Sequence, residues 1–406
     1  MLAFTARRLL TPDEIIDHAV MVVDDGRVLE IASRADGQLP AHAAHFDFGD
    51  AVIVPGYVDL HIHGSGGFDV MDDRPEALPA IERVLARHGV TSYFPTTVTA
   101  SMESTLRALE RLADAIEAGG QTSRERTSER QTIEQRTARE RIRDGGRAVP
   151  LGIHLEGPFI SHARRGVHPP ENLLPPKIET FERFWQAARG HIRVMTIAPE
   201  LEGAIELIGA AAARGVCVSL GHSDADFAAT ERAIDAGARH ATHIFNAMRP
   251  LGHREPGILG AVLTDERVSA DIIADGIHVD PAIVKLVAKA KGRELVLITD
   301  ATAATGMPDG RYRLGSMEVD VKDGVCSFDG KLAGSVLTMD RAVRNFAQFA
   351  GWSVSEAVSA ASRNPARVAG CAAKGVLSAG VDADFLVLNE RGEVLRTFVG
   401  GVEAVP

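Results

Sequence analysis

Short apolar runs alternate with segments of helical spacing along most of the chain. The runs occupy residues 53–60, 90–94, 149–155, 192–197, 216–220, 241–244, 268–274 and 294–299. Strands of a parallel sheet are buried on both faces and therefore read as nearly continuous apolar runs. Because strands that alternate with helices form parallel sheets, the pattern predicts an α/β fold in which eight strands close a (β/α)8 TIM-like barrel.

The segments between the runs have the spacing of amphipathic helices, with examples at 79–88, 227–236 and 281–290. Asp280-Pro281 begins the last of these segments and supplies an N-cap followed by a first-turn proline. The two chain ends differ, because they consist of short alternating runs separated by turn signals such as Asp24-Asp25-Gly26 and Ala35-Asp36-Gly37. We expect residues 1–52 and 371–406 to form one small β-sandwich domain beside a barrel of residues 53–370.

A charged segment at residues 119–147 interrupts the barrel pattern. It contains eight arginines, five acidic residues and almost no apolar side chains. Such a composition cannot build a core and favours a solvated helix extension or a disordered insertion. A nucleic-acid-binding arm is disfavoured, because the segment has no aromatic residue on which a base could stack.

Composition excludes several other classes of function. The 406 residues are 45% hydrophobic and carry a net charge of −11, which disfavours a nucleic-acid or anionic-membrane partner. The three cysteines, Cys217, Cys326 and Cys371, have no metal-type spacing, and their odd number disfavours a disulfide framework. No secretory or membrane-spanning pattern occurs, so we expect a cytoplasmic protein.

Side chains that can bind a metal stand at the ends of several apolar runs. His61 and His63 lie at alternate positions, and side chains at i and i+2 of a strand point the same way. The other candidates are Glu156, His222, His243 and Asp300. Functional groups of a (β/α)8 barrel gather at the carboxyl ends of its strands, so we expect these six side chains to converge. One strand-end histidine alone would be read as structural, but the set predicts a metal site.

The ligand types indicate the chemistry of this site. Imidazole and carboxylate ligands without thiolates suit zinc, with iron, cobalt and manganese as alternatives. Such an ion lowers the pKa of a bound water to about 7 and polarises a carbonyl group, which favours hydrolysis. A further carboxylate is then needed to move the proton from water to the leaving group, and we assign this role to Asp300.

Several motifs resemble those of a known family. The His61-Ile62-His63 pair, the later histidines and the final aspartate resemble the amidohydrolase superfamily. Six motifs are similar to those of N-acetylglucosamine-6-phosphate deacetylases, namely His154-Leu155-Glu156-Gly157-Pro158-Phe159, Gly221-His222-Ser223, Thr242-His243-Ile244-Phe245-Asn246-Ala247-Met248, Gly276-Ile277-His278, Thr299-Asp300-Ala301 and Leu332-Ala333-Gly334-Ser335. The resemblance covers residues 55–337, and the chain ends fit the small β domain of that family.

The resemblance implies an activity and a set of roles. The activity is metal-dependent hydrolysis of N-acetylglucosamine 6-phosphate to glucosamine 6-phosphate and acetate, in amino-sugar catabolism and cell-wall sugar recycling. One ion would be held by Glu156, His222 and His243. A second would be held by His61 and His63 with Glu156 shared, and because some members use one metal, one or two ions are expected.

The resemblance also implies how the substrate is held. The implied contacts are His168, Asn246, Ala247, Arg254, His278, Leu332, Ala333, Gly334 and Ser335. Arg254 and His278 would meet the phosphate, and a contact contributed by a neighbouring subunit implies a homodimer. His154 shares a face with Glu156 and is a candidate for supporting the metal ligands.

Two other functions remain open from the sequence. The same chemistry could act on N-acetylgalactosamine 6-phosphate or another acylated amine, because epimers differ in one hydroxyl group. A catalytically idle binding protein could retain the fold, but such a protein would be expected to lose its acid/base carboxylate, and Asp300 is present.

Overall fold

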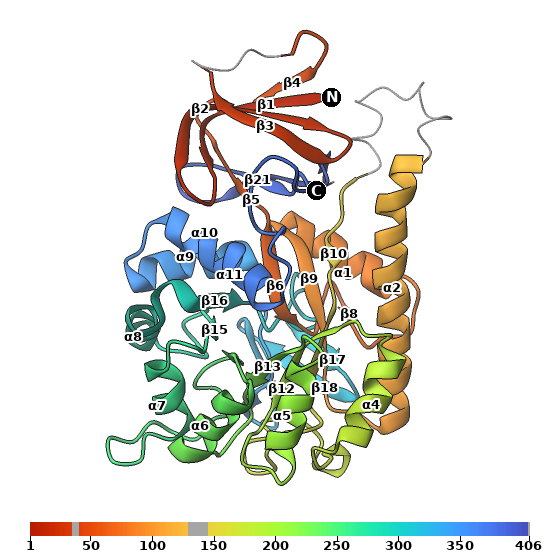
Figure 1. Cartoon of the computed structure of the whole chain (residues 1–406), viewed down its shortest axis with the longest axis vertical. Coiled ribbons are helices and arrows are strands. Elements are labelled where there is room, and N and C mark those ends of the chain that lie inside the picture. The colour runs from red at the N-terminus through yellow and green to blue at the C-terminus, as the bar shows by residue number, and fades with distance from the viewer. Residues whose placement is uncertain (35–39, 129–144, 405–406) are drawn as a thin grey trace.

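The chain builds a barrel of alternating strands and helices with a small β domain above it, as the computed structural model in Figure 1 shows. The structure describes residues 1–34, 40–128 and 145–404. The turn expected at Ala35-Asp36-Gly37 and much of the charged segment lie outside the described residues. The barrel strands are β6 (Tyr57–Ile62), β9 (Val90–Thr97), β10 (Val149–Pro150) with β11 (Ile153–Glu156), β12 (Ile192–Ile197), β13 (Cys217–Leu220), β14 (His240–Ala241), β15 (Ala270–Ile273) and β16 (Leu295–Ile298).

All these strands run in parallel, which confirms the expected (β/α)8 barrel. Regular pairing joins β6 to β14 through β9, β11, β12 and β13, and it joins β15 to β16. Backbone hydrogen bonds from residues just beyond β14 and β16 link β14 to β15 and β16 to β6. The Ile244 N–H donates to Asp271 O over 2.9 Å, and the Asp300 N–H donates to His61 O over 3.0 Å. The second bond places Asp300 beside the expected histidine pair.

Helices cover the outside of the barrel. They are α1 (Ala77–Arg87), α2 (Met102–Ser128), α4 (Ile178–Ala187), α5 (Ala204–Ala212), α6 (Phe227–Ala236), α7 (Gly257–Thr264), α8 (Pro281–Lys291), α9 (Met339–Ala350), α10 (Val354–Ala361) and α11 (Arg363–Val368). The three helices expected at 79–88, 227–236 and 281–290 are therefore confirmed. Asp280 caps α8 by accepting a hydrogen bond from the Ala282 N–H, with Pro281 in the first turn. Among the described residues, no helix combines the length and apolar character needed to cross a bilayer.

Both chain ends form the small β domain. Its sheet joins β1 (Leu2–Leu10), β2 (Ile15–Asp24), β3 (Arg27–Ser33), β4 (Ala44–Asp47), β5 (Val52–Pro55), β21 (Phe385–Leu388), β22 (Val394–Val399) and β23 (Val402–Glu403). Phe4 of β1 packs edge-on against Phe385 and Phe398, with ring centroids 4.9 and 5.2 Å apart. This aromatic core holds the N-terminal strands to the C-terminal ones, so neither chain end forms the domain alone.

The first apolar run is two strands and not one. Residues 52–55 form β5, which pairs with β1 and β21 in the small domain, and β6 begins the barrel at Tyr57. Gly56 lies between the two strands. A larger residue does not fit there, because a Cβ would lie 2.2 Å from Thr91 Oγ1. The single strand expected over 53–60 is therefore wrong, and the boundary expected at residue 52 falls within β5.

Two insertions cover the carboxyl end of the barrel. One is the hairpin of β7 (Gly64–Ser65) and β8 (Phe68–Asp69), and the other is the antiparallel sheet of β17 (Gly310–Leu314), β18 (Met317–Lys322), β19 (Val325–Phe328) and β20 (Lys331–Leu332). The buried Asp69 joins them, since its two carboxylate oxygens accept from the Met71 N–H over 2.7 Å and the Gly315 N–H over 2.8 Å.

We expect Lys374→Met to destabilise the protein by about 2–4 kcal/mol, because it leaves two carboxylates without their cation. Lys374 Nζ lies 2.7 Å from Asp382 and 2.6 Å from the buried Asp384. Burial alone would lower the pKa of Lys374, but the carboxylates of Asp384 and Asp382 raise it above its ordinary value of 10.5. The stabilisation is therefore fully present below pH 10.5 and is lost as the pH rises through the higher folded-state pKa.

Urea unfolding of Lys374→Met and wild type at two neutral pH values measures this difference. Lys285→Met removes an exposed lysine of α8 and is the matched control. Equal unfolding free energies for wild type and Lys374→Met would contradict the expectation.

Candidate active site

The six predicted side chains converge at the carboxyl end of the barrel. Each lies within two residues of the end of its strand, and all six residues are buried. Three of them have left-handed backbone conformations, with φ of 47° at His222, 30° at His243 and 49° at Asp300. Non-glycine residues seldom adopt this region, and such strain gathers at functional sites.

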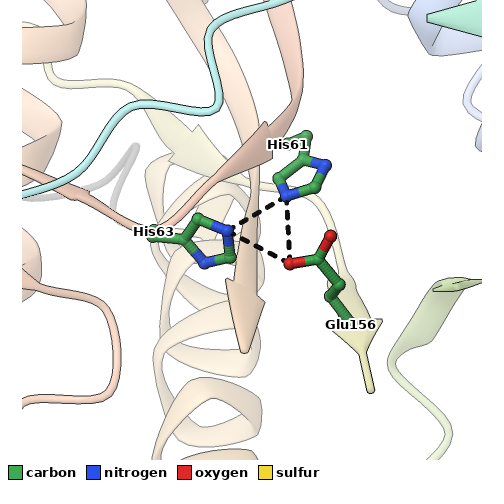
Figure 2. Close-up of side chains that lie close together, drawn as sticks. All are labelled: His61, His63 and Glu156. Carbon is green, nitrogen blue, oxygen red and sulfur yellow. Dashed lines mark hydrogen bonds and ion pairs between the residues drawn. The ribbon is translucent and has the colours of Figure 1, made fainter. Parts of the chain in front are cut away.

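The histidine pair and Glu156 form one group of candidate ligands, shown in Figure 2. His61 Nε2 and His63 Nε2 lie 3.1 Å apart. Glu156 Oε2 lies 3.4 Å from His61 Nε2 and 3.2 Å from His63 Nε2. Three ligand atoms from β6 and β11 therefore surround one point.

The other carboxylate oxygen of Glu156 faces a second group. Glu156 Oε1 lies 3.3 Å from His222 Nε2 and 3.1 Å from His243 Nε2, and these two nitrogens are themselves 3.1 Å apart. Glu156 thus offers one oxygen to each pair of histidines. This geometry suits a carboxylate that is shared between two ions.

The hydrogen bonds of the rings indicate that these groups are built for a cation. The Nδ1 atom of His63 lies 3.0 Å from Thr96 O, and the Nδ1 atom of His222 lies 3.0 Å from Arg164 O. A carbonyl oxygen only accepts, so each Nδ1 donates its proton and leaves the Nε2 lone pair directed at the centre. Zinc–nitrogen bonds of about 2.0–2.1 Å in a tetrahedron place two ligands about 3.3 Å apart. The observed separations are close to that edge length, so the residues fit a divalent metal.

The protonation of Glu156 agrees with a ligand role. Burial alone would raise its pKa, but the adjacent His61, His222 and His243 hold the pKa well below its ordinary value. The group is therefore a carboxylate at neutral pH, which is the form that binds metal.

Asp300 stands beside the first group. Its Oδ1 atom lies 3.3 Å from His63 Nε2 and 3.6 Å from His61 Nε2. Burial alone would raise the pKa of Asp300, but His61, His63 and His243 lower it to about 2. The carboxylate is ionised at neutral pH and can take a proton from a water bound between the ligands.

Two buried carboxylates beneath the ligands were missed at the sequence level. Asp59 accepts from Thr299 Oγ1 over 2.6 Å and from the His61 N–H over 3.4 Å, so it joins the strands that carry the histidine pair and Asp300. Burial raises the pKa of Asp59 to about 7. The alternation Asp59, His61, His63 was the signal that could have identified it.

Asp271 supports the other side of the site. It accepts a short hydrogen bond from the His243 N–H, and its second oxygen lies 2.9 Å from His240 Nε2. Both members of the His240–Asp271 pair are fully buried. Asp271 therefore holds the backbone of His243 itself, where the left-handed conformation occurs. No local sequence signal distinguishes this aspartate from a structural one.

His154 packs beside the candidate metal ligands and is not one of them. Its Nδ1 lies 3.2 Å from Leu60 O, its Nε2 lies 2.8 Å from Thr196 Oγ1, and its ring packs edge-on against His61 at 4.6 Å between centroids. Both ring nitrogens are therefore occupied. Burial lowers the pKa of His154 well below its ordinary value, so the ring is neutral.

His168 enters the site from the loop after β11. Its Nε2 lies 3.7 Å from Glu156 Oε2, and its Nδ1 lies 2.8 Å from Thr99 Oγ1. Burial and the neighbouring His222 lower the pKa of His168 to about 3, so the ring is neutral. His168 is thus a polar group directed at the ligand cluster without being a member of it.

Four predicted substrate residues lie on segments that follow β14 and β15 at the carboxyl end of the barrel. Asn246 and Ala247 are half-buried after β14, and the Ala247 N–H donates no hydrogen bond within the described residues. Arg254 is exposed and has no ion-pair partner in the described part of the chain. His278 Nδ1 lies 2.7 Å from Asp275 Oδ2, which fixes the orientation of its ring.

The segment Leu332-Ala333-Gly334-Ser335 lies against Asp300. The Ser335 N–H donates to Asp300 O over 2.7 Å, and Ser335 Oγ donates to Thr299 O over 2.6 Å. Gly334 has a φ of 60°, and a Cβ there would lie 2.6 Å from Thr302 Cγ2. Ser335 is therefore placed behind Asp300, Ala333 is buried, and Leu332 is the exposed member of the segment.

Comparison with known proteins identifies relatives that are named as deacetylases of N-acetylated amino-sugar 6-phosphates. The chain is 37% identical over 398 residues to the N-acetylgalactosamine-6-phosphate deacetylase of Escherichia coli O157:H7, covering 98% of this chain and 97% of the relative. It is 38% identical over 370 residues to the N-acetylglucosamine-6-phosphate deacetylase of Bos taurus, covering 87% of this chain and 84% of the relative.

Solved structures share the whole fold. A variant of the Mycobacterium smegmatis N-acetyl-D-glucosamine-6-phosphate deacetylase, in complex with N-acetyl-D-glucosamine-6-phosphate, matches with a TM-score of 0.88 and 35% identity over 100% of this chain and 99% of that one. The Thermotoga maritima N-acetylglucosamine-6-phosphate deacetylase matches with a TM-score of 0.83 and 31% identity over 99% of each chain. The model of the amidohydrolase family matches residues 52–404. Together with the metal-ligand geometry, these similarities show that the chain belongs to the amidohydrolase family.

Proposed function

We propose that this enzyme hydrolyses the acetamide of N-acetylglucosamine 6-phosphate to glucosamine 6-phosphate and acetate. The observation that carries the proposal is the shared carboxylate of Glu156 between two histidine pairs, with the ionised Asp300 3.3 Å from one of them. Relatives named for this activity are similar over nearly the whole chain. The site therefore supplies both the ligands and the proton-transfer group that amide hydrolysis needs.

Different residues of the chain perform different steps of the proposed reaction. A divalent ion, when bound, supplies the Lewis acidity that lowers the pKa of water to about 7 and polarises the amide carbonyl. Asp300 accepts a proton from the attacking water and later gives it to the departing amine nitrogen. His168 Nε2–H donates to the carbonyl oxygen as negative charge develops there. Asn246 and Ala247 offer an amide and a backbone N–H to the sugar, and Arg254 and His278 hold its phosphate.

We propose zinc as the ion, because the ligands are four imidazoles and one carboxylate, although iron, cobalt and manganese accept the same ligands. The two groups of ligands support two ions per subunit. Elemental analysis of the purified protein, with His61→Gln as the variant that removes one group, measures both identity and number. If the number of metal ions per subunit is the same in His61→Gln as in the wild type, the result would favour one ion at Glu156, His222 and His243.

A second substrate is supported by the relative from Escherichia coli O157:H7, whose name specifies the galactosamine epimer. Acetate release from N-acetylglucosamine 6-phosphate, N-acetylgalactosamine 6-phosphate and free N-acetylglucosamine distinguishes the candidates. Preference for the first compound supports the proposal. Preference for the second assigns the epimer, and no release by the metal-loaded enzyme from any of them would refute the deacetylase.

Arg254→Ala is expected to lower kcat/KM for the phosphorylated sugar by about 10- to 100-fold, because hydrogen bonds to a charged group contribute about 1.5–3 kcal/mol. Activity on the unphosphorylated sugar should barely change. Arg293→Ala, which removes an exposed arginine just before β16 at the opposite end of the barrel, is the matched control. Unchanged discrimination between the two sugars would remove Arg254 from the phosphate site.

We also propose that the enzyme is a homodimer. Four large apolar side chains are exposed on segments that follow barrel strands at the active-site end, namely Leu251, Ile277, Met307 and Leu332. Arg254 lies on the same loop as Leu251, so an interface over these loops would bring it near the site of a second copy. Light scattering at several protein concentrations measures the assembly, and a monomer at all of them would refute the dimer.

A further inference from the structure

We propose that Thr99 is a positioning residue, which fixes His168 in the tautomer that donates from Nε2. The inference deepens the proposed function and rests on it, because it requires His168 to face the carbonyl oxygen of the substrate. Thr99 lies two residues beyond the end of β9 and is 2% exposed, and His168 is 5% exposed. The pair is therefore shielded from water that could exchange their hydrogen bonds.

Two polar groups of Thr99 lie within hydrogen-bond distance of the same ring nitrogen. The Thr99 N–H donates to His168 Nδ1 over 3.3 Å, and Thr99 Oγ1 lies 2.8 Å from the same atom. A backbone N–H cannot accept a hydrogen bond, so Nδ1 carries no proton. A neutral imidazole has one N–H, which must then be on Nε2. That atom lies 3.7 Å from Glu156 Oε2, so its proton is directed toward the ligand cluster.

The neighbouring histidines have the opposite arrangement. His63 and His222 each place Nδ1 against a backbone carbonyl, which makes Nδ1 the donor and Nε2 the metal ligand. His168 places Nδ1 against a backbone N–H, which makes Nε2 the donor and prevents it from binding the metal. The type of backbone group behind each ring therefore separates the ligands from the hydrogen-bond donor.

Space for this arrangement is provided by Gly157, which follows the ligand Glu156. A Cβ at Gly157 would lie 2.0 Å from Thr99 Oγ1 and 3.6 Å from His168 Nδ1. Gly157 also has a φ of 74°, a conformation that favours glycine. The Thr99 hydroxyl thus occupies a position that any larger residue at 157 would block.

Thr99→Val tests the role of the hydroxyl while it keeps the backbone N–H and the side-chain shape. Because the longer of the two hydrogen bonds remains, we expect kcat to fall about 10-fold, less than the 10²–10³-fold loss typical when a whole oxyanion donor is removed. KM and metal content should change little. Thr99→Ser restores a hydroxyl and should recover most of kcat.

Thr97→Val is the matched control. Thr97 lies on β9, is 1% exposed, and its hydroxyl has no hydrogen-bond partner among the described residues. The variant Thr97→Val should retain the wild-type kcat. If kcat falls as much in Thr97→Val as in Thr99→Val, the loss of any buried hydroxyl in or near β9 has the same effect. That result would overturn the proposal.

Nitrogen NMR of histidine-labelled, metal-loaded protein measures the tautomer itself, with the His168 signals assigned from a His168→Gln variant. We expect a protonated Nε2 and an unprotonated Nδ1 in wild type and in Thr99→Ser, and a mixture in Thr99→Val. A protonated Nδ1 in the wild type would overturn the proposal, even if Thr99→Val fails to fold. This readout needs no substrate, so it separates failure of the Thr99 role from failure of the proposed deacetylase activity.

Kinetic coupling gives an independent check. If Thr99 acts through His168, the double variant Thr99→Val/His168→Gln should be no slower than His168→Gln alone. Additive losses in kcat would show that the two residues act separately and would contradict the positioning role.

Discussion

Asp300→Asn is expected to lower kcat by about 1,000-fold, because general acid–base catalysis contributes about 10²–10⁴-fold and the same carboxylate serves as base and acid. Asparagine keeps the size of the side chain but cannot take a proton from water. The backbone bonds of Asp300, donated to His61 O over 3.0 Å and accepted from the Ser335 N–H over 2.7 Å, remain in the variant. Metal content and thermal midpoint should therefore stay close to the wild-type values.

Acetate release and elemental analysis on the same preparation measure this result. Asp329→Asn is the matched control, because Asp329 has a similar φ of 48° but is exposed in the turn after β19. A variant Asp300→Asn that keeps near-normal turnover would eliminate Asp300 as the acid/base. Loss of metal together with activity would instead make Asp300 an essential ligand.

Glu156→Gln is expected to lower the metal content of both ligand groups and to reduce turnover by about 1,000-fold or more. The two oxygens of Glu156 face different histidine pairs at 3.1–3.4 Å. A carboxamide offers one oxygen and one N–H₂ group, and the amide hydrogens cannot bind a cation. One group of ligands therefore loses its carboxylate oxygen outright, and the other loses the negative charge.

Elemental analysis against a titration of added zinc measures the loss. Glu82→Gln is the control, because Glu82 on α1 is a half-buried carboxyl outside the ligand groups, whose pKa burial raises to about 7. Full metal content in Glu156→Gln would contradict the shared-ligand geometry. Selective loss from one group would show that only one oxygen of Glu156 binds metal.

Much of the fold follows from local patterns. Apolar runs of four to eight residues, followed by amphipathic segments, placed the barrel strands and helices such as α6 and α8. The errors arose where a run contains a break that only packing explains. Gly56 interrupts the first run because the Thr91 side chain occupies the space where a Cβ would lie. Nothing in residues 52–62 alone shows that Thr91 is there.

The candidate ligands were predictable for a similar reason. Each lies at or near the end of an apolar run, and parallel strands end at one edge of the barrel, so His61, Glu156, His222, His243 and Asp300 had to be neighbours once the barrel closed. The supporting residues were not predictable. Asp271 is one of many aspartates, and its hydrogen bond to the His243 N–H joins residues 28 positions apart.

The sequence by itself determined which side chains meet at the end of the barrel, because strand order and alternation fix their positions. Only the tertiary structure decided which backbone group lies behind each histidine ring. His63, His222 and His168 are the same residue type, but Thr96 and Arg164 offer carbonyl oxygens to the first two rings whereas Thr99 offers an N–H to the third. Those backbone groups come from segments 33 to 69 residues away, so no local pattern carries that information.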